Sequence, residues 1–399
     1  MLAERMKKIE ASPTLKVLLA AAQLKRQGVD VVDLGAGEPD FPTPSHVKAA
    51  AQRAIEENFT RYTPNAGIPE LKQAIADSYR SLYDVAFDER EIIATAGGKQ
   101  ALFNIAMALF GPGDEVIIHA PYWPTLVEVV RLAEATPVLV RTHADNGFRV
   151  RAETILAAVT PRTKGIVINS PGNPTGALMS EDDMAAVADA AAAKGIWVVL
   201  DLCYERLIYD PHPHDLVGVL TRRARDRAVL AGSASKAYAM TGWRCGWVVG
   251  PVDVVAACDA IQSHSTSNVS SITQKAAVAA LSGPQDCVAS MLAEYRVRRD
   301  HVHAWLTADG RITCLKPAGA FYLFPDVTAL LSPTGIRTTN QLAEALLHEA
   351  RVALTAGEAF DAPGFVRISY ATSLDRLREG TDRILAFADR VTGSGASAR

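Results

Sequence analysis

Short apolar runs rich in β-branched residues alternate with longer helical stretches between about residues 90 and 250. This alternation is typical of βαβ units, so it predicts a mainly parallel sheet covered by helices. The predicted strands are Glu115–His119, Pro137–Val140, Gly165–Asn169, Ile196–Asp201, Ala228–Ser233 and Gly246–Gly250.

Two helices have clear sequence signals. Ser180 is a good N-cap, acidic residues follow in the first turn, and an Ala-rich interior ends at Lys194 and Gly195. A longer pattern of charged and apolar residues predicts a second helix over Cys287–Thr307. Short strands return afterwards, near Phe321–Phe324 and Val366–Ser369, which indicates a second, smaller domain.

Length, charge and cysteine content narrow the class of protein. With 399 residues the chain is long enough for two lobes, and a net charge of -3 offers no basic excess for nucleic acid. Five cysteines without a C-x-x-C spacing argue against a disulfide framework and a zinc site. The apolar run Val17–Ala22 is too short for a signal sequence or a membrane span, so we expect a cytoplasmic protein.

Chemically informative residues follow the predicted strands, where open parallel sheets bind ligands. Lys236, after Ser233-Ala234-Ser235, could form an imine with a cofactor aldehyde, although most lysines are surface groups. Asp201 could pair with a cationic ring nitrogen, or simply cap the next turn. Tyr204 and Asn173 could donate hydrogen bonds to a ring oxygen, and either could equally be structural.

A phosphate site would need backbone N–H groups, hydroxyls and a cation. Gly97–Ala101 opens an apolar helix whose N-terminus suits an anion, or it is a flexible turn. Ser233 and Ser235 offer hydroxyls, and Arg244 offers a two-pronged guanidinium. Trp123 follows another strand, where an indole could stack on a flat ring or belong to the core.

Four motifs in this order and spacing resemble the class I, fold-type I aminotransferases. They are Asn169–Gly176 (NSPGNPTG), Asp201–Tyr204, Ser233–Lys236 and Gly242–Gly246 (GWRCG). The resemblance extends to Ala36–Phe41, Tyr62–Pro64, Gly97–Gln100, Gly319–Tyr322 and Val366–Tyr370, and so covers nearly the whole chain. It implies a pyridoxal 5′-phosphate (PLP) enzyme that acts as a homodimer with shared active sites.

The resemblance also implies an α/β architecture. The large PLP-binding domain, 46–288, would contain a mainly parallel seven-stranded sheet covered by helices. A smaller α/β domain would comprise 289–399, and the segment 1–45 would contribute to it.

The resemblance assigns roles residue by residue. Lys236 would be the Schiff-base lysine, Asp201 the partner of the pyridinium nitrogen, and Asn173 and Tyr204 the donors to the ring oxygen. The phosphate would lie among Gly98, Lys99, Gln100, Ser233, Ser235 and Arg244, with Tyr62 reaching it from the neighbouring subunit. Arg367 would bind the substrate α-carboxylate, with Gly37, Trp123, Asn173 and Lys99 also lining the substrate site, and Trp123 stacked on the ring. No metal is expected.

The subgroup that this chain resembles is the aspartate aminotransferases with G-G-K-Q at the phosphate turn. In that subgroup the lysine also meets the distal carboxylate of the substrate, and Lys99 matches it. Ser12 and Thr14 match hydroxyls near the same pocket, or form a plain helix cap. Two departures, Leu202-Cys203 between Asp201 and Tyr204 and Pro124–Leu126 after the tryptophan, could reshape the substrate pocket.

The expected reaction is ping-pong transamination between an amino acid, with aspartate or glutamate favoured, and a 2-oxo acid. Aromatic or prephenate-type specificity, and a PLP-dependent lyase on the same fold, stay open as alternatives. Three other classes are disfavoured. Gly35-Ala36-Gly37 lacks the remaining glycine of a dinucleotide site, we expect no DNA-binding segment before Gly37, and His212-Pro213-His214 is predicted to be a surface loop, not a metal site.

Overall fold

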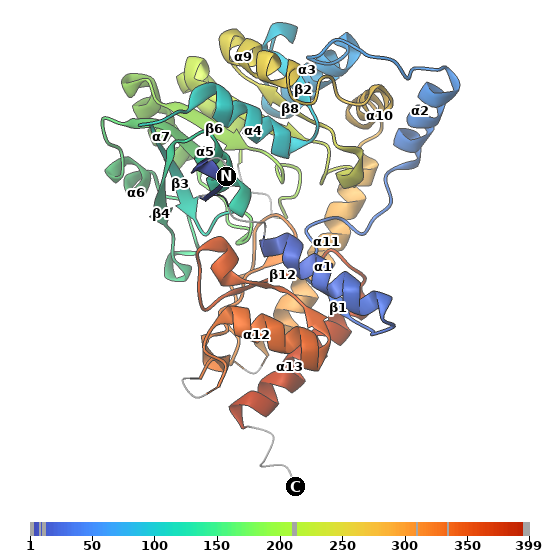
Figure 1. Cartoon of the computed structure of the whole chain (residues 1–399), viewed down its shortest axis with the longest axis vertical. Helices are drawn as coiled ribbons and strands as arrows, with labels where there is room; N and C mark the ends of the chain where they lie inside the picture. Colours follow the sequence, from blue (N-terminus) through green and yellow to red (C-terminus); the bar gives the residue numbers. More distant parts are fainter. Residues whose placement is uncertain are drawn as a thin grey trace.

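The computed structural model describes residues 4–7, 9, 13–209, 214–308, 310–332 and 335–393. A seven-stranded sheet lies in the upper part of Figure 1, and a smaller group of helices and short strands lies below it. None of the helices in the described ranges combines the length and the apolar character needed to cross a bilayer.

The large sheet confirms the predicted α/β fold class. Its order is β2 (Ile92–Thr95), β8 (Gly246–Val249), β7 (Ala228–Ser233), β6 (Trp197–Asp201), β5 (Thr163–Asn169), β3 (Glu115–Ala120), β4 (Thr136–Arg141). Strand β8 is antiparallel to both of its neighbours, and the remaining pairs are parallel. All six strands predicted in this region are present, and β2 is the strand that the sequence pattern did not reveal.

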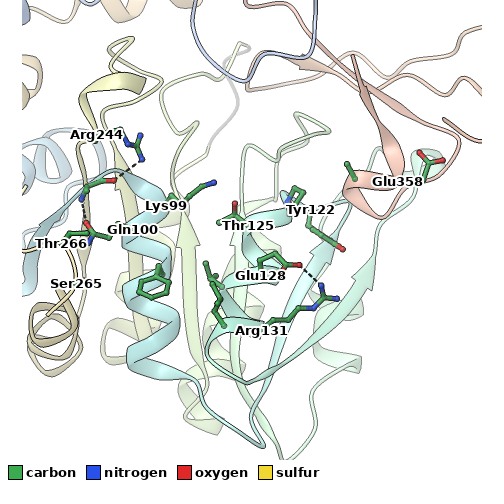
Figure 2. A pocket seen from close by; sticks show the side chains of 16 residues that line it. Lys99, Gln100, Tyr122, Thr125, Glu128, Arg131, Arg244, Ser265, Thr266 and Glu358 are labelled. Atoms are coloured by element: carbon green, nitrogen blue, oxygen red, sulfur yellow. Dashed lines mark hydrogen bonds and ion pairs between the residues drawn. The ribbon is translucent and has the colours of Figure 1, made fainter. Parts of the chain in front are cut away.

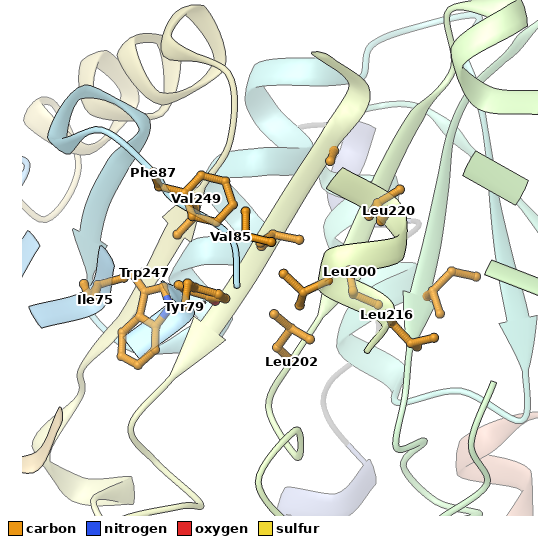
Figure 3. Close-up of a cluster of buried hydrophobic side chains, with 14 of the residues drawn as sticks. Ile75, Tyr79, Val85, Phe87, Leu200, Leu202, Leu216, Leu220, Trp247 and Val249 are labelled. Carbon is orange, nitrogen blue, oxygen red and sulfur yellow. Dashed lines mark hydrogen bonds between the residues drawn. The ribbon is translucent and has the colours of Figure 1, made fainter. Parts of the chain in front are cut away.

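Both faces of the sheet are buried, which explains why its strands are apolar runs without alternation. In β6, Val198 and Leu200 pack into one hydrophobic cluster, shown in part in Figure 3, whereas Trp197 and Val199 pack into the other. The first cluster includes residues of α2 (Ser45–Glu56), α3 (Pro69–Tyr83), α6 (Ala152–Ala157), α7 (Glu181–Lys194), α8 (Leu216–Ala224) and α10 (Ser271–Ser282). The second includes residues of α4 (Gly98–Leu109), α5 (Pro124–Leu132) and α9 (Val252–Ser263).

The predicted helix caps of α7 are confirmed. The Ser180 side chain accepts a hydrogen bond from the Asp183 backbone N–H, and Gly195 adopts a left-handed conformation with φ 69°. Helix α11 (Asp286–Thr307) matches the second predicted helix, and Figure 1 shows it running from the upper lobe into the lower one. Val288 packs in a cluster of the large sheet, whereas Met291 and Tyr295 belong to a separate core.

That separate core holds the smaller lobe together. The elements of the smaller lobe are α1 (Pro13–Arg26), β1 (Val32–Asp33), β9 (Tyr322–Leu323), α12 (Thr339–Ala345), β10 (Val352–Ala353), β11 (Thr355–Ala356), β12 (Val366–Ser369) and α13 (Leu374–Thr392). Strands β1 and β10 pair in parallel, and β11, β12 and β9 form an antiparallel sheet. Helix α11 passes from the core of the large lobe into the core of the smaller lobe just after Val288, which is consistent with a domain boundary near this residue. The exact domain boundaries stay predictions.

Strand register brings the informative residues together. Asn169 at the end of β5 is the direct partner of Asp201 at the end of β6, and Asp201 in turn pairs with Ala231 of β7. The loop after β6 then enters the smaller core through Tyr204. The carboxyl edge of the sheet therefore faces the smaller lobe, and the site lies between them.

Candidate active site

A cavity of about 350 Å³ lies at this edge of the sheet. Lys236, in the turn after β7, lines it, and its Nζ donates a hydrogen bond to the Gly37 carbonyl oxygen at 2.6 Å. Burial lowers the pKa of the Lys236 ammonium, because removal from water disfavours its charged form. The structure therefore presents an amine that is easier to deprotonate than an exposed lysine.

Asp201 lines the same cavity from the end of β6 and is 4% exposed. Burial raises the pKa of its carboxyl to about 6, and the Cys203 backbone N–H and the charge of Lys236 oppose this shift only in part. The Cys203 N–H donates to Asp201 Oδ1 at 3.1 Å and fixes the carboxylate orientation. A buried carboxylate of this kind gains stability when a cation reaches it.

Two asparagines connect Asp201 with Arg367 of β12. Asn169 Oδ1 accepts from the Asn173 backbone N–H at 2.9 Å, and Asn169 Nδ2 donates to the Asp201 carbonyl oxygen at 3.4 Å. Arg367 Nη1 donates to Asn173 Oδ1 at 3.1 Å and Nη2 to the Gly35 carbonyl oxygen at 2.8 Å. Among the described residues, the buried Arg367 Nε has no hydrogen-bond partner. The guanidinium lines the cavity, where the remaining N–H groups of its Nη atoms suit a ligand carboxylate.

Tyr204 belongs to an aromatic wall of the cavity. Its hydroxyl lies 2.7 Å from the Tyr322 hydroxyl, and burial raises the pKa of the Tyr204 phenol well above its ordinary value. Both phenols therefore keep their protons at neutral pH and can act as hydrogen-bond donors.

The opposite end of the cavity is suited to an anion. Helix α4 begins at Gly98, so its N-terminal N–H groups and its dipole face the cavity. Ser233 and Ser235 line the same end, and Ser233 Oγ donates to Ser235 Oγ at 2.9 Å. Gly97 has φ +87°, and a Cβ there would lie 2.5 Å from Arg244 Nη2, so the turn that brings Arg244 close requires glycine.

Lys99 stands where this cavity meets a second hollow of about 720 Å³. Its Nζ lies 5.1 Å from the Trp123 ring centroid, and burial followed by the charge of Arg244 lowers the pKa of the Lys99 ammonium. Figure 2 shows this second hollow, which Lys99 and Arg244 also line, with the Glu128–Arg131 ion pair farther along it.

Most of the predicted site residues meet in one place. The cavity is lined by Gly37, Gly98, Lys99, Trp123, Asn173, Asp201, Tyr204, Ser233, Ser235, Lys236, Arg244 and Arg367. Gln100 lines the second hollow instead, where its side chain bonds to the Ala96 N–H and to Thr266 Oγ1. Tyr62 is 91% exposed and lies outside the cavity. Ser12 is outside the described residues, as is the side chain of Thr14.

The cavity also contains Asn169, Cys203 and Tyr322, to which sequence reasoning assigned no binding role, although it named Cys203 as a residue that could reshape the pocket. Asn169 belongs to the NSPGNPTG motif and Tyr322 to Gly319–Tyr322, so the motifs held a signal that pointed to them. Throughout the described ranges, no three His, Cys, Asp or Glu side chains gather in a way that could hold a metal ion. The arrangement instead offers a lysine amine, a buried carboxylate, an end of the cavity that is suited to an anion, and a guanidinium.

Comparison with known proteins assigns the family. The model of the family "Aminotransferase class I and II" matches residues 29–384. An aspartate aminotransferase of Geobacillus stearothermophilus is 41% identical over 388 residues, covering 97% of this chain and 99% of that protein. An aspartate/prephenate aminotransferase of Cereibacter sphaeroides is 42% identical, with coverage of 97% and 98%.

A solved structure supports the same assignment. The aspartate aminotransferase of Thermus thermophilus, determined with maleate, has a TM-score of 0.91 and 41% sequence identity, covering 98% of this chain and 99% of that one. This chain is therefore similar to these relatives over nearly its full length, in sequence as well as in fold. The chain is therefore a transaminase and belongs to the aminotransferases of class I and II.

Proposed function

We propose that the chain is a PLP-dependent aminotransferase that uses aspartate or glutamate as amino donor and a 2-oxo acid as acceptor. The observation that supports this most directly is the shared cavity, in which Lys236, Asp201 and Arg367 meet an anion-binding end. The relatives reported above are named as aminotransferases, so a lyase is not favoured.

The cavity residues fit PLP in charge and in hydrogen-bonding character. The buried Asp201 carboxylate suits the protonated ring nitrogen, and Lys236 suits the aldehyde. The α4 N-terminus, Ser233, Ser235 and Arg244 suit the phosphate. Asn173, Tyr204 and Trp123 are the proposed contacts of the ring. When bound, PLP supplies an electron sink that stabilises negative charge at the substrate Cα and carries the amino group between the two substrates.

The residues of the chain then have distinct tasks. Arg367 would bind the α-carboxylate and so would fix the orientation of the substrate Cα. Burial lowers the pKa of the Lys236 ammonium, so its neutral amine can take the proton from the substrate Cα. Lys236 then gives this proton to the carbon that is protonated as the amino group is transferred. Asp201 keeps the ring nitrogen protonated, and Tyr204 and Asn173 donate to the ring oxygen. Gly37 lets the backbone approach the substrate.

Lys99 is the proposed contact of the distal carboxylate. Its ammonium stands between the cavity and the second hollow, against the indole of Trp123, and can reach a side chain that extends from the substrate. The Thermus thermophilus relative was determined with maleate, a dicarboxylate, which supports a dicarboxylic substrate for this site.

We also propose a homodimer with shared sites. Tyr62 is 91% exposed and lies outside the cavity of its own chain, so the proposed role at the phosphate turn would fall to the Tyr62 of a second copy. Gln100, which bonds to Thr266 on the wall of the second hollow, would then support the turn and the interface together.

A donor screen tests the function. Aspartate with 2-oxoglutarate as acceptor, and glutamate with oxaloacetate as acceptor, should react faster than alanine, phenylalanine or prephenate-derived donors do with the same acceptors. Lys236→Ala should abolish the absorbance of the imine between residue 236 and PLP, and should slow turnover by well over ~10²–10⁴-fold. Release of ammonia without an acceptor would contradict transamination, and full activity of Lys236→Ala would contradict the role of the lysine.

A further inference from the structure

Tyr322 lies against three of the proposed site residues, Tyr204, Arg367 and Gly37. It lies on β9, is 1% exposed and lines the cavity. Its hydroxyl is 2.7 Å from that of Tyr204, and its ring centroid lies 4.3 Å from the Arg367 guanidinium carbon. A Cβ on Gly37 would be 3.1 Å from the same hydroxyl, so the space beside Gly37 belongs to Tyr322.

Tyr322 and Tyr204 together have two hydroxyl protons, one on each phenol. The hydrogen bond between the two hydroxyls uses one of these protons and leaves the other available for a ligand. Within the described part of the chain, neither hydroxyl has a further hydrogen-bond partner. If Tyr322 donates, the Tyr204 proton is free for a ligand, and accepting from Tyr322 polarises the Tyr204 O–H and strengthens its donation.

The ring of Tyr322 acts on a different group. The Arg367 guanidinium carbon lies 4.3 Å from the centroid of the Tyr322 ring and 5.2 Å from that of the Phe360 ring. Two of its nitrogens donate to Asn173 and Gly35, and Nε has no hydrogen-bond partner among the described residues. The aromatic contacts therefore help to hold the guanidinium in place without consuming the donors that a carboxylate would use.

We propose that Tyr322 is a positioning residue with two separable functions. Its hydroxyl donates to Tyr204 and thereby directs the Tyr204 proton to the cofactor ring oxygen. Its ring holds Arg367 in the orientation that receives the substrate α-carboxylate. The inference rests on the proposed function, because it assumes that PLP and an amino acid occupy this cavity.

Two substitutions separate the functions. Tyr322→Phe keeps the ring and removes the hydroxyl, whereas Tyr322→Leu removes both. Tyr370→Phe is the matched control, because Tyr370 is also fully buried and its hydroxyl bonds to Tyr209 and Ala320 away from the cavity. Each purified protein is loaded with PLP, its visible absorbance is titrated with pH, and KM and kcat are measured with aspartate and 2-oxoglutarate.

The expected results differ between the variants. In Tyr322→Phe, Tyr204 donates a weaker hydrogen bond to the cofactor ring oxygen, so this oxygen keeps more negative charge. The charge holds the proton on the imine nitrogen of Lys236 more tightly. The pH midpoint of the absorbance should therefore rise by about half a unit, with KM for aspartate within about twofold of wild type. Tyr322→Leu should show the same rise and also increase KM by about tenfold. Tyr370→Phe should match wild type in both readouts.

Three outcomes would overturn the inference. A midpoint in Tyr322→Phe equal to that of Tyr370→Phe removes the function of the hydroxyl. An unchanged KM in Tyr322→Leu removes the function of the ring, and if that variant does not fold, the Phe variant still tests the hydroxyl. A wild-type chain that neither binds PLP nor transaminates would instead contradict the proposed function, so the two failures are distinguishable.

Discussion

Replacing Asp201 by Asn should stabilise the cofactor-free protein while impairing its function. Burial raises the pKa of the Asp201 carboxyl from 3.8 to about 6. The folded chain therefore holds this proton more tightly than the unfolded chain, so the free energy of unfolding declines as pH rises from about 4 to about 6 and stays lower above that. A shift of about two pKa units corresponds to about 3 kcal/mol at neutral or higher pH.

Asn is neutral at every pH and retains an oxygen that can accept from the Cys203 N–H, so it escapes this penalty. We expect Asp201→Asn without cofactor to be more stable than wild type by up to about 3 kcal/mol at pH 8, and by little at pH 4. With PLP the order should reverse. Asn cannot pair with a cationic ring nitrogen, and losing one partner of a buried ion pair costs about 3–5 kcal/mol, which predicts a loss of about 10²–10⁴-fold in turnover.

Glu205→Gln is the matched control. Burial also raises the pKa of the Glu205 carboxyl, to about 7, while the Tyr83 hydroxyl donates to it at 2.6 Å. Glu205 does not line the cavity, so its substitution should change the pH dependence of stability without changing PLP binding.

Urea unfolding at pH 4 and pH 8, with and without PLP, measures both effects for wild type and the two variants. If cofactor-free Asp201→Asn were less stable than wild type at pH 8, burial of the carboxylate would not be the dominant effect at this position. The reasoning about Asp201 would then be refuted even if activity were lost.

Three further predictions concern substrate recognition and the fold. Lys99→Ala should raise KM for aspartate and glutamate far more than for alanine or phenylalanine in steady-state assays, and equal changes for all four would remove its proposed role. Arg367→Lys loses the fork geometry that holds Asn173 and Gly35, so kcat/KM should fall by about 10–100-fold for every amino acid, whereas a loss confined to dicarboxylic donors would contradict carboxylate binding. Ser180→Ala removes the cap of α7 and should reduce the free energy of unfolding by about 1 kcal/mol in urea titrations, with kcat unchanged; a change in kcat would show that the cap affects the site.

The large sheet could be predicted from the sequence because its strands are apolar along their whole length. Strand β6 sends Val198 and Leu200 to one face and Val199 to the other, and both faces are covered, so the whole run is apolar and stands out. Strand β2 has only four residues and follows a short helical turn at Glu89–Glu91, which left too little pattern to detect. The strands of the smaller lobe are two residues long in several cases, below what periodicity can resolve.

The candidate site was predictable where residues follow strands. Asp201 and Lys236 come after apolar runs, and parallel strands end at one edge, so their convergence follows from topology. Tyr322 could not be placed in the same way. Its hydroxyl meets that of Tyr204 across 118 residues of sequence, and its ring looks like an ordinary core aromatic of a short strand. Contacts between the two lobes depend on how the lobes pack, which local patterns do not encode.

The stability argument for Asp201 applies to the cavity as a whole. The Lys236 ammonium has its pKa lowered by burial, the Asp201 carboxyl has its pKa raised by burial, and the buried Arg367 Nε has no hydrogen-bond partner in the described part of the chain. Each of these groups destabilises the cofactor-free fold, and each would be relieved by a different part of PLP or of an amino acid. Ligand binding should therefore increase the free energy of unfolding by more than the cavity's apolar contacts alone would give, and the increase should shrink when Asp201 is already neutral.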